Sequence, residues 1–242
     1  MTKQYCTNLP DGSSFCVGTA EGVFQPTFTS ELCLKAFWKE NRKVSRVLDL
    51  GCGCGLVGLA VTRSGMAEAP VCASDLSSVA VRLTAENAQR LGIACDCRAG
   101  SLFEPWAGET FDVIIDDVSG IAEPVARVSP WFGEVIPCSS GADGSDLTRA
   151  VLREVGLHLR PNGVLFFPVI SLSSRARILG EARTRFADVS LVASQSWGLP
   201  DQMRPQMNFL RKLQSEGSID FREILGVVVC STEIYCARFP IQ

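Results

Sequence analysis

The stretch Arg46-Val-Leu-Asp-Leu-Gly-Cys-Gly-Cys-Gly55 decides the fold that we predict for this chain. It begins with an apolar run typical of a buried parallel strand and ends in three alternate glycines, Gly51, Gly53 and Gly55. Residues 56–61, which follow, are apolar at helical spacing. Glycines let the backbone approach a ligand closely, and the N–H groups at a helix start recognise polar groups. The sequence therefore predicts a strand, a glycine loop and a helix that together form a nucleotide site.

Two acids flank the glycine loop and narrow the kind of ligand. Asp49 lies two residues before the first glycine, and Asp75 ends the next apolar run, 70–75. An acid at the end of the second strand can accept hydrogen bonds from both hydroxyls of a ribose. The pattern D-x-G-x-G-x-G places the third glycine one residue earlier than the G-x-G-x-x-G of dinucleotide sites, and no G-x-x-x-x-G-K-[ST] phosphate loop is present.

This pattern resembles motif I of the class I S-adenosylmethionine-dependent methyltransferases. The resemblance implies an α/β fold, with a Rossmann-like seven-stranded, mostly parallel sheet, helices on both faces and an antiparallel C-terminal strand. It also implies S-adenosylmethionine as a co-substrate or substrate, and no metal. An NAD-type Rossmann domain and a non-catalytic relative are the alternatives.

Between Gly22 and Ile170 the chain more narrowly resembles the HemK-type glutamine methyltransferases. The matching segments are Gly22-Val-Phe-Gln-Pro-Thr27, Gly100-Ser-Leu-Phe-Glu-Pro105 and Gly141-Ala-Asp-Gly144. In that group the first segment closes over the cofactor, so we expect residues 1–40 to form an N-terminal extension and cofactor lid, and residues 41–242 the methyltransferase-fold domain. The expected cofactor-binding residues are Phe24, Gln25, Thr29, Asp49, Gly51, Cys52, Gly53, Gly55, Asp75, Leu76, Ser101 (in place of the group's aspartate), Leu102 and Asp116.

The most diagnostic substrate motif of that group, N-P-P-Y, is missing. At the C-terminal end of the apolar strand 111–115, where ligands sit in open α/β sheets, the chain has Asp116, Asp117, Val118 and Ser119 instead. Carboxylates can bind a cation or deprotonate an amine or hydroxyl, and adjacent strand side chains point to opposite faces. We therefore expect Asp116, Asp117 and Ser119 to be catalytic, with Asp116 facing the cofactor. A solvated loop acid is the alternative.

Aromatic side chains are expected around the reacting atoms. The stretch 121–140 contains three prolines and the pair Trp131 and Phe132, which is typical of an irregular loop over a pocket. We expect these two residues and Phe28 to line the substrate pocket, with ordinary core packing as the alternative. The insertion 198–225, which separates the last two expected strands, is expected to line the substrate mouth or to form a dimer contact.

Composition argues against several classes of function. A net charge of -3 and a pI of about 5.3 leave no general basic surface for nucleic acid. No apolar run reaches the roughly 18 residues of a membrane span, and the N-terminus lacks a signal-peptide hydrophobic region, so we expect a cytoplasmic protein. The 11 cysteines are odd in number and contain no C-x-x-C pair, which favours reduced, buried thiols over zinc ligands or disulfides. The single histidine, His158, excludes histidine dyads.

Three functions remain open on the sequence. Methyl transfer to a small metabolite is favoured over transfer to protein, because N-P-P-Y is absent, and over transfer to nucleic acid, because the charge is acidic. The second is an intramolecular reaction like that of the azetidine-2-carboxylate synthases of natural-product pathways, in which the amino group of S-adenosylmethionine attacks its own γ-carbon and expels methylthioadenosine. Such a reaction needs no acceptor site. The third is a non-catalytic S-adenosylmethionine-binding subunit.

Overall fold

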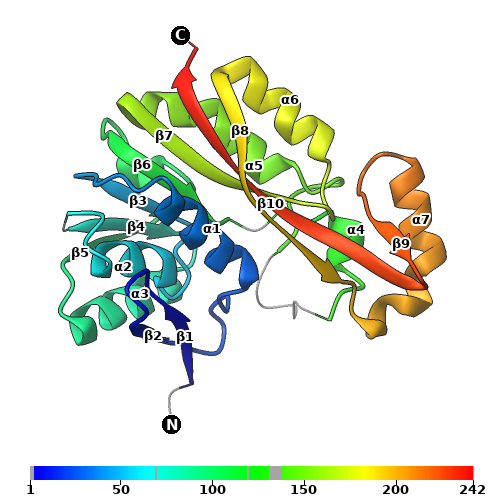
Figure 1. Cartoon of the computed structure of the whole chain (residues 1–242), viewed down its shortest axis with the longest axis horizontal. Helices are drawn as coiled ribbons and strands as arrows, with labels where there is room; N and C mark the ends of the chain where they lie inside the picture. The colour runs from blue at the N-terminus through cyan, green and yellow to red at the C-terminus, as the bar shows by residue number, and fades with distance from the viewer. Residues whose placement is uncertain (1–2, 69, 119, 131–137, 242) are drawn as a thin grey trace.

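A central, mostly parallel sheet organises the chain (Figure 1). The computed structural model describes residues 3–68, 70–118, 120–130 and 138–241. The strand order is β5-β4-β3-β6-β7-β10-β8, and β10 lies antiparallel to both β7 and β8. The short strand β9 pairs with β10 outside this order. The strands are β3 (Val47–Leu50), β4 (Val71–Asp75), β5 (Cys95–Ala99), β6 (Phe111–Asp116), β7 (Leu159–Ile170), β8 (Phe186–Gly198), β9 (Arg222–Ile224) and β10 (Val227–Pro240).

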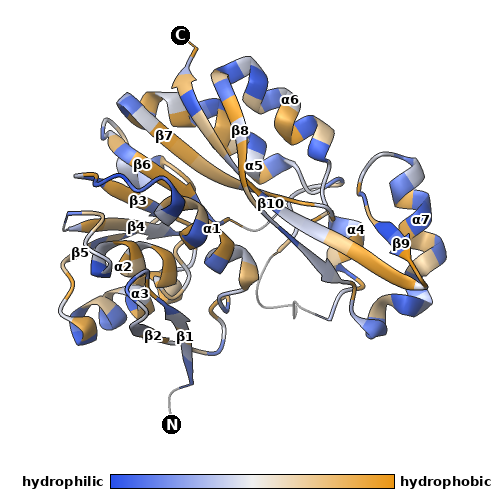
Figure 2. Cartoon of the chain, viewed as in Figure 1, coloured by the Kyte–Doolittle hydropathy of each residue, from blue (hydrophilic) through white to orange (hydrophobic). Residues whose placement is uncertain are grey.

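Helices cover both faces of the sheet, and the predicted fold class is confirmed. The three helices α1, α2 and α3 pack on one face, whereas α5 and α6 pack on the other. The parallel strands are therefore apolar on both sides, as the colouring of β7 in Figure 2 shows. The helices are α1 (Phe28–Lys39), α2 (Leu56–Arg63), α3 (Ser78–Leu91), α4 (Glu123–Ala126), α5 (Asp146–Glu154), α6 (Arg175–Arg185) and α7 (Met207–Ser215), with the 3-10 turns η1 (Glu104–Trp106), η2 (Val155–His158) and η3 (Asp201–Gln206).

The connection from β3 to α2 is fixed from within the protein. Asp49, on β3, is fully buried, and its Oδ2 accepts a hydrogen bond from the backbone N–H of Gly58 at 2.8 Å. A Cβ atom on Gly58 would lie 2.9 Å from the Cβ of Asp49, so only glycine permits this close approach of helix and strand. Asp49 therefore holds α2 against the sheet and sets the position of the glycine loop.

An N-terminal hairpin lies beside α3, and it corrects one expectation from the sequence. Strands β1 (Gln4–Asn8) and β2 (Ser14–Gly18) pair antiparallel, and Cys6 and Cys16 stand opposite each other and form a disulfide. The prediction of reduced thiols is thus wrong for this pair, because only the strand register brings two cysteines ten residues apart within a Cα–Cα distance of 4.1 Å. The other nine cysteines are free.

The insertion between β8 and β10 builds a C-terminal lobe on the right of Figure 1. We use this name for α4, η3, α7, β9 and the ends of β8 and β10 that lie beside them. Its core consists of Ile121, Val125, Leu172, Met203, Leu210, Leu213, Ile219, Phe221 and Cys230. The described residues include no helix with the length and apolar character of a membrane span.

Candidate active site

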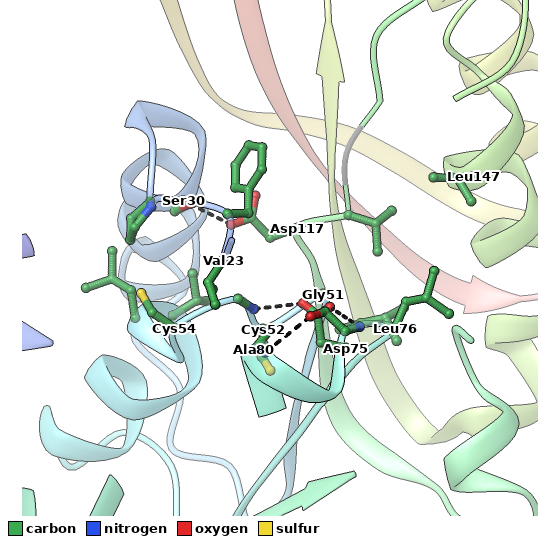
Figure 3. A pocket seen from close by; sticks show the side chains of 18 of the residues that line it. Val23, Ser30, Gly51, Cys52, Cys54, Asp75, Leu76, Ala80, Asp117 and Leu147 are labelled. Carbon is green, nitrogen blue, oxygen red and sulfur yellow. Dashed lines mark hydrogen bonds between the residues drawn. The ribbon is translucent and has the colours of Figure 1, made fainter. Parts of the chain in front are cut away.

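A cavity of about 560 Å³ opens at the carboxyl ends of β3, β4 and β6. In open α/β sheets this edge holds the ligand, and the volume falls within the range of small-molecule sites. Figure 3 shows its walls, with Asp75 on one side and Ser30 and Asp117 on the other. The described lining residues include Val23, Phe24, Ser30, Gly51, Cys52, Gly53, Asp75, Leu76, Ser101, Leu102, Asp117, Val118 and Leu147.

The glycine loop forms the floor of this cavity. Gly51 has a φ of 83°, and a Cβ atom there would meet Val118 at 3.0 Å. The backbone N–H of Gly53 donates to Oδ2 of Asp75 at 3.0 Å, and the N–H of Ser77, which caps α3, donates to Oδ1 at 2.8 Å. These two bonds hold the Asp75 carboxylate at the cavity wall, where each oxygen keeps a further lone pair for a ligand hydroxyl.

Two leucines at the cavity wall have features that packing within the chain does not explain. Leu76 follows β4 and is 72% exposed, although it is a large apolar side chain. Leu102 has a φ of 45°, a strained value for a residue with a side chain, and such strain is concentrated at functional sites. A flat aromatic base that covered Leu76 would remove this apolar surface from water.

A second cavity, of about 430 Å³, adjoins the first one. The two cavities share Phe24, Asp117 and Val118 as lining residues. Phe28 and Trp197 form an aromatic pair in the second cavity, with ring centroids 5.5 Å apart. The remaining described lining is largely apolar, with Gln25, Thr27, Thr29, Gly120, Ile121, Cys138, Pro168, Ile170, Leu172, Gly198, Pro200 and Thr232.

Asp117 lies where the two cavities meet. Its Oδ2 accepts a hydrogen bond of 2.6 Å from the hydroxyl of Ser30, on α1. The surrounding protein excludes most water and raises the pKa of Asp117 to about 7, although the Ser30 bond lowers it. A carboxylate with a pKa near neutrality is suited to accept a proton from a bound ligand.

Asp116 points away from both cavities, contrary to the prediction. Val113 and Ile115 belong to the core cluster that includes α1, α2 and α3, and Asp117 has the same strand parity. Asp116 has the parity of Ile114, which belongs to the cluster on the opposite face. Asp116 is fully buried, and its Oδ1 accepts from the N–H of Val118 at 3.0 Å. Burial, with a smaller contribution from the charge of Asp117, raises the pKa of Asp116 to about 8, although the hydrogen bond from Val118 lowers it.

The structure brings together most of the residues that the sequence singled out. Asp49 and Gly55 support the loop from behind without lining either cavity. Ser119, Trp131 and Phe132 lie outside the described residues. The first cavity takes Phe24, Gly51, Cys52, Gly53, Asp75, Leu76, Ser101 and Leu102, and the second takes Phe24, Gln25, Phe28 and Thr29.

Sequence reasoning missed two residues of the site. Ser30 was not singled out, yet its hydroxyl donates to Asp117 and also accepts from the backbone N–H of Thr27 in the capping box of α1. Trp197 ends an expected strand, and its indole N–H donates to the Thr232 hydroxyl at 3.2 Å, which orients the ring in the second cavity. A tryptophan directly before an insertion was the available signal for the second residue.

The charged residues that line the two cavities, among those described, are all acidic. Asp75 and Asp117 are acidic, and no lysine, arginine or histidine occurs among the described lining residues. No group of His, Cys, Asp or Glu side chains that could hold a metal ion was found in the part of the chain that the structure describes. The site is therefore suited to neutral or cationic ligands.

The strand order, the glycine loop and the acid that ends β4 define the class I methyltransferase fold. In agreement, the family model described as "Methyltransferase small domain" matches residues 15–117. The chain is related to S-adenosylmethionine-dependent methyltransferases near the HemK-type group, as its likeness to release factor glutamine methyltransferases shows.

The matches between this chain and known proteins cover only part of the length of each known protein. The ribosomal protein L11 methyltransferase of Synechococcus sp. (strain RCC307) is 38% identical over 133 residues, which cover 53% of this chain and 40% of that protein. The release factor glutamine methyltransferase of Bordetella pertussis is 34% identical over 120 residues, 49% of this chain and 44% of that protein. The chain thus spans less than half the length of these two relatives.

Solved structures show the same fold over the whole chain. The T. thermophilus 16S rRNA N2 G1207 methyltransferase, solved in complex with AdoMet and guanosine, gives a TM-score of 0.61 at 15% identity. The match covers 98% of this chain and 50% of the other. At this identity the match shows the fold alone.

Proposed function

We propose that this chain is an S-adenosylmethionine-dependent methyltransferase that methylates a small molecule bound in the second cavity. The observation that carries the proposal is the pair of adjoining cavities with Asp117 at their junction. One cavity has the glycine loop and acid of a cofactor site, and the other provides a separate place for an acceptor. An enzyme that joins two reactants needs such a geometry, because holding both in place supplies much of the rate enhancement.

The first cavity fits S-adenosylmethionine residue by residue. Asp75 is placed to accept from the ribose hydroxyls, and Leu76 and Leu102 offer apolar surface to the adenine. Because Gly51 and Gly53 have no side chains, the methionine part of S-adenosylmethionine can approach the backbone at the cavity floor. Asp49 and Asp117 lie at this sheet edge without a basic partner among the described residues, so their negative charge favours a cationic sulfur over a neutral one.

Asp117 is the residue that we assign to proton transfer. S-adenosylmethionine, when bound, supplies a methyl group activated by the positive charge on its sulfur. Asp117 accepts the proton that the acceptor's nitrogen or oxygen loses, and Ser30 holds its carboxylate in place at 2.6 Å. The segment with Val23 and Phe24 lines the first cavity from the N-terminal side, which supports our assignment of residues 1–40 as a lid.

The shape of the second cavity favours a small acceptor over a macromolecule. The names of the relatives point to proteins and RNA as their substrates. The second cavity instead has a volume of about 430 Å³ and no basic residue in its described lining. The N-P-P-Y motif of the release factor enzymes is replaced by residues 116–119.

The same cavity argues against intramolecular cyclisation of S-adenosylmethionine. A reaction of the cofactor with itself has no use for a second, aromatic-lined cavity beside the first. The intact glycine loop, with Asp49 and Asp75 both engaged, supports a binding-competent protein over one that has lost its ligand.

The test is product analysis by mass spectrometry. The purified protein is incubated with S-adenosylmethionine alone, with the small-molecule filtrate of a cell extract, and with the macromolecular fraction. We expect S-adenosylhomocysteine only with the filtrate, and little of it from an Asp75→Asn variant. Methylthioadenosine from the cofactor alone would show cyclisation, and turnover only with the macromolecular fraction would show a protein or RNA substrate.

A further inference from the structure

The second cavity combines apolar walls with one acidic group. Asp117 is the only charged residue among its described lining residues, and most of the other walls are carbon surface. Two further buried acids, Asp49 and Asp116, stand at the same sheet edge, and burial raises the pKa of each. Neither their side chains nor that of Asp117 forms an ion pair within the described part of the chain.

We propose that the acceptor is a compact apolar molecule with a single amino group, which enters beside Asp117 as an ammonium ion. This inference rests on the proposed function and specifies its substrate class. Acidic acceptors and neutral alcohols are then excluded as the preferred ligands.

Charge selects the amino group. A hydrogen bond between an ammonium and a carboxylate is roughly twice as strong as one between neutral groups, and a partly dry cavity strengthens it further. A carboxylate or phosphate on the acceptor would face Asp117 without any described lysine, arginine or histidine in the lining to compensate. An alcohol would gain one ordinary hydrogen bond.

The aromatic pair of Phe28 and Trp197 favours an acceptor with an apolar body. Phe28 and Trp197 are tilted by 53° to each other, so they form a corner rather than a flat stack. The indole N–H of Trp197 donates to the Thr232 hydroxyl, which holds the indole in place, and Trp197 lines the cavity.

The C-terminal lobe contributes to the walls of the second cavity. Trp197 and Pro200 flank the end of β8, where the chain leaves the sheet for the lobe. Leu199 continues the pairing, because its N–H donates to the carbonyl of Val228 at 2.9 Å. The start of the insertion, at Gly198 and Pro200, therefore contributes to the described lining of the second cavity.

Three matched probes test the proposal. Benzylamine, benzyl alcohol and benzoate share one ring and differ only in charge and polar group. Their binding is measured by ligand-observed NMR on protein saturated with S-adenosylhomocysteine, which allows no turnover. We expect benzylamine to bind about tenfold or more tightly than benzyl alcohol, and benzoate least of the three.

Variants assign the effect to residues. Asp117→Asn should reduce benzylamine binding to the level of benzyl alcohol, whereas Trp197→Ala should weaken both. Glu86→Gln, which removes an exposed acid on α3, is the matched control and should bind like the wild type. The comparison of the three probes on the wild-type protein stands even if a variant fails to fold.

The outcomes separate this inference from the proposed function. A protein that binds S-adenosylhomocysteine, but binds benzyl alcohol or benzoate as tightly as benzylamine, keeps the proposed function and overturns the amine assignment. Equal benzylamine binding by wild type and a folded Asp117→Asn variant overturns it as well. A wild-type protein that does not bind S-adenosylhomocysteine overturns the proposed function itself.

Discussion

At the scale of single residues, Asp117 differs from Asp116 in having both a cavity beside it and a hydroxyl partner. Its pKa of about 7 gives a testable pH dependence. Because only the ionised carboxylate accepts a proton, we expect the rate of methyl transfer to rise as the pH increases through about 7. The pH profile of S-adenosylhomocysteine formation measures this, and Asp117→Asn should lower kcat by about 10²–10⁴-fold and remove the rise.

Ser30→Ala provides the control for that assignment. The Ser30 hydroxyl stabilises the ionised form of Asp117, so its removal should move the midpoint of the pH profile upward. An unchanged midpoint in this variant, or a rise that persists in Asp117→Asn, would show that another group titrates.

The raised pKa of Asp116 leads us to expect that the stability of the protein depends on pH. Its pKa is about 8 in the folded protein and near 4 in an unfolded chain, so the folded protein holds this proton more tightly. The stabilisation is therefore complete below about pH 4 and is lost as the pH rises through about 8. Thermal melts should show a smaller loss of Tm between these limits for Asp116→Asn than for the wild type. Parallel curves for the two proteins would contradict this.

Individual site residues were predictable where a motif fixes their role. Asp75 follows a buried strand at a set distance from the glycines, and the structure places it at the cavity wall. The sequence favoured Asp116, whereas only Asp117 lines the described cavities, because the outcome depends on which face of β6 each side chain occupies. Tertiary packing decides which face of β6 each side chain points to, and two adjacent aspartates in the sequence give no information about it.

At the scale of elements, one side chain links the N-terminal hairpin to the glycine loop. Asn87, on α3, donates to the carbonyls of Gly18 and Cys54 at 2.9 Å each, and its Oδ1 accepts from the N–H of Gly18 at 2.8 Å. It is buried, so its loss would leave three backbone groups without their partner.

We therefore expect Asn87→Ala to lower the free energy of unfolding by roughly 2–4 kcal/mol and to weaken cofactor binding. Denaturant unfolding and calorimetry measure the two effects. Gln89→Ala, two residues further along the same helix and exposed, should change neither. Loss of stability with unchanged cofactor affinity would show that the hairpin does not support the loop.

The elements around β3 were the most predictable ones. The buried run before Gly51 and the apolar spacing after Gly55 predicted β3 and α2, and both are present. The Cys6–Cys16 disulfide was not predictable, because the odd cysteine count and the absence of C-x-x-C describe composition, not the register of a hairpin.

At the scale of the whole molecule, the C-terminal lobe was the least predictable part. The sequence indicated an insertion, but the core of the lobe forms with residues as distant as Ile121 and Val125. No periodicity within the insertion shows such partners. The sheet was predictable because its strands are continuous apolar runs, which are buried on both faces in this class of fold.

We expect the C-terminal lobe to fold as a unit that is needed for binding of the acceptor. Leu210→Ala removes a fully buried side chain from its core and should cost about 2–5 kcal/mol of stability. We expect benzylamine binding to weaken while S-adenosylhomocysteine binding is kept. Leu225→Ala, at a position 99% exposed, is the matched control. Equal losses at both ligands in Leu210→Ala would contradict a separate role for the lobe.

Isothermal titration of the purified protein with S-adenosylmethionine tests the central assignment most directly. We predict that the wild type and Glu86→Gln bind one molecule with the same affinity. We predict that Asp75→Asn binds about tenfold or more weakly, because a charged acceptor at the ribose is lost. Absence of binding by the folded wild type, or equal affinity in Asp75→Asn, would contradict the assignment of this cavity as the cofactor site.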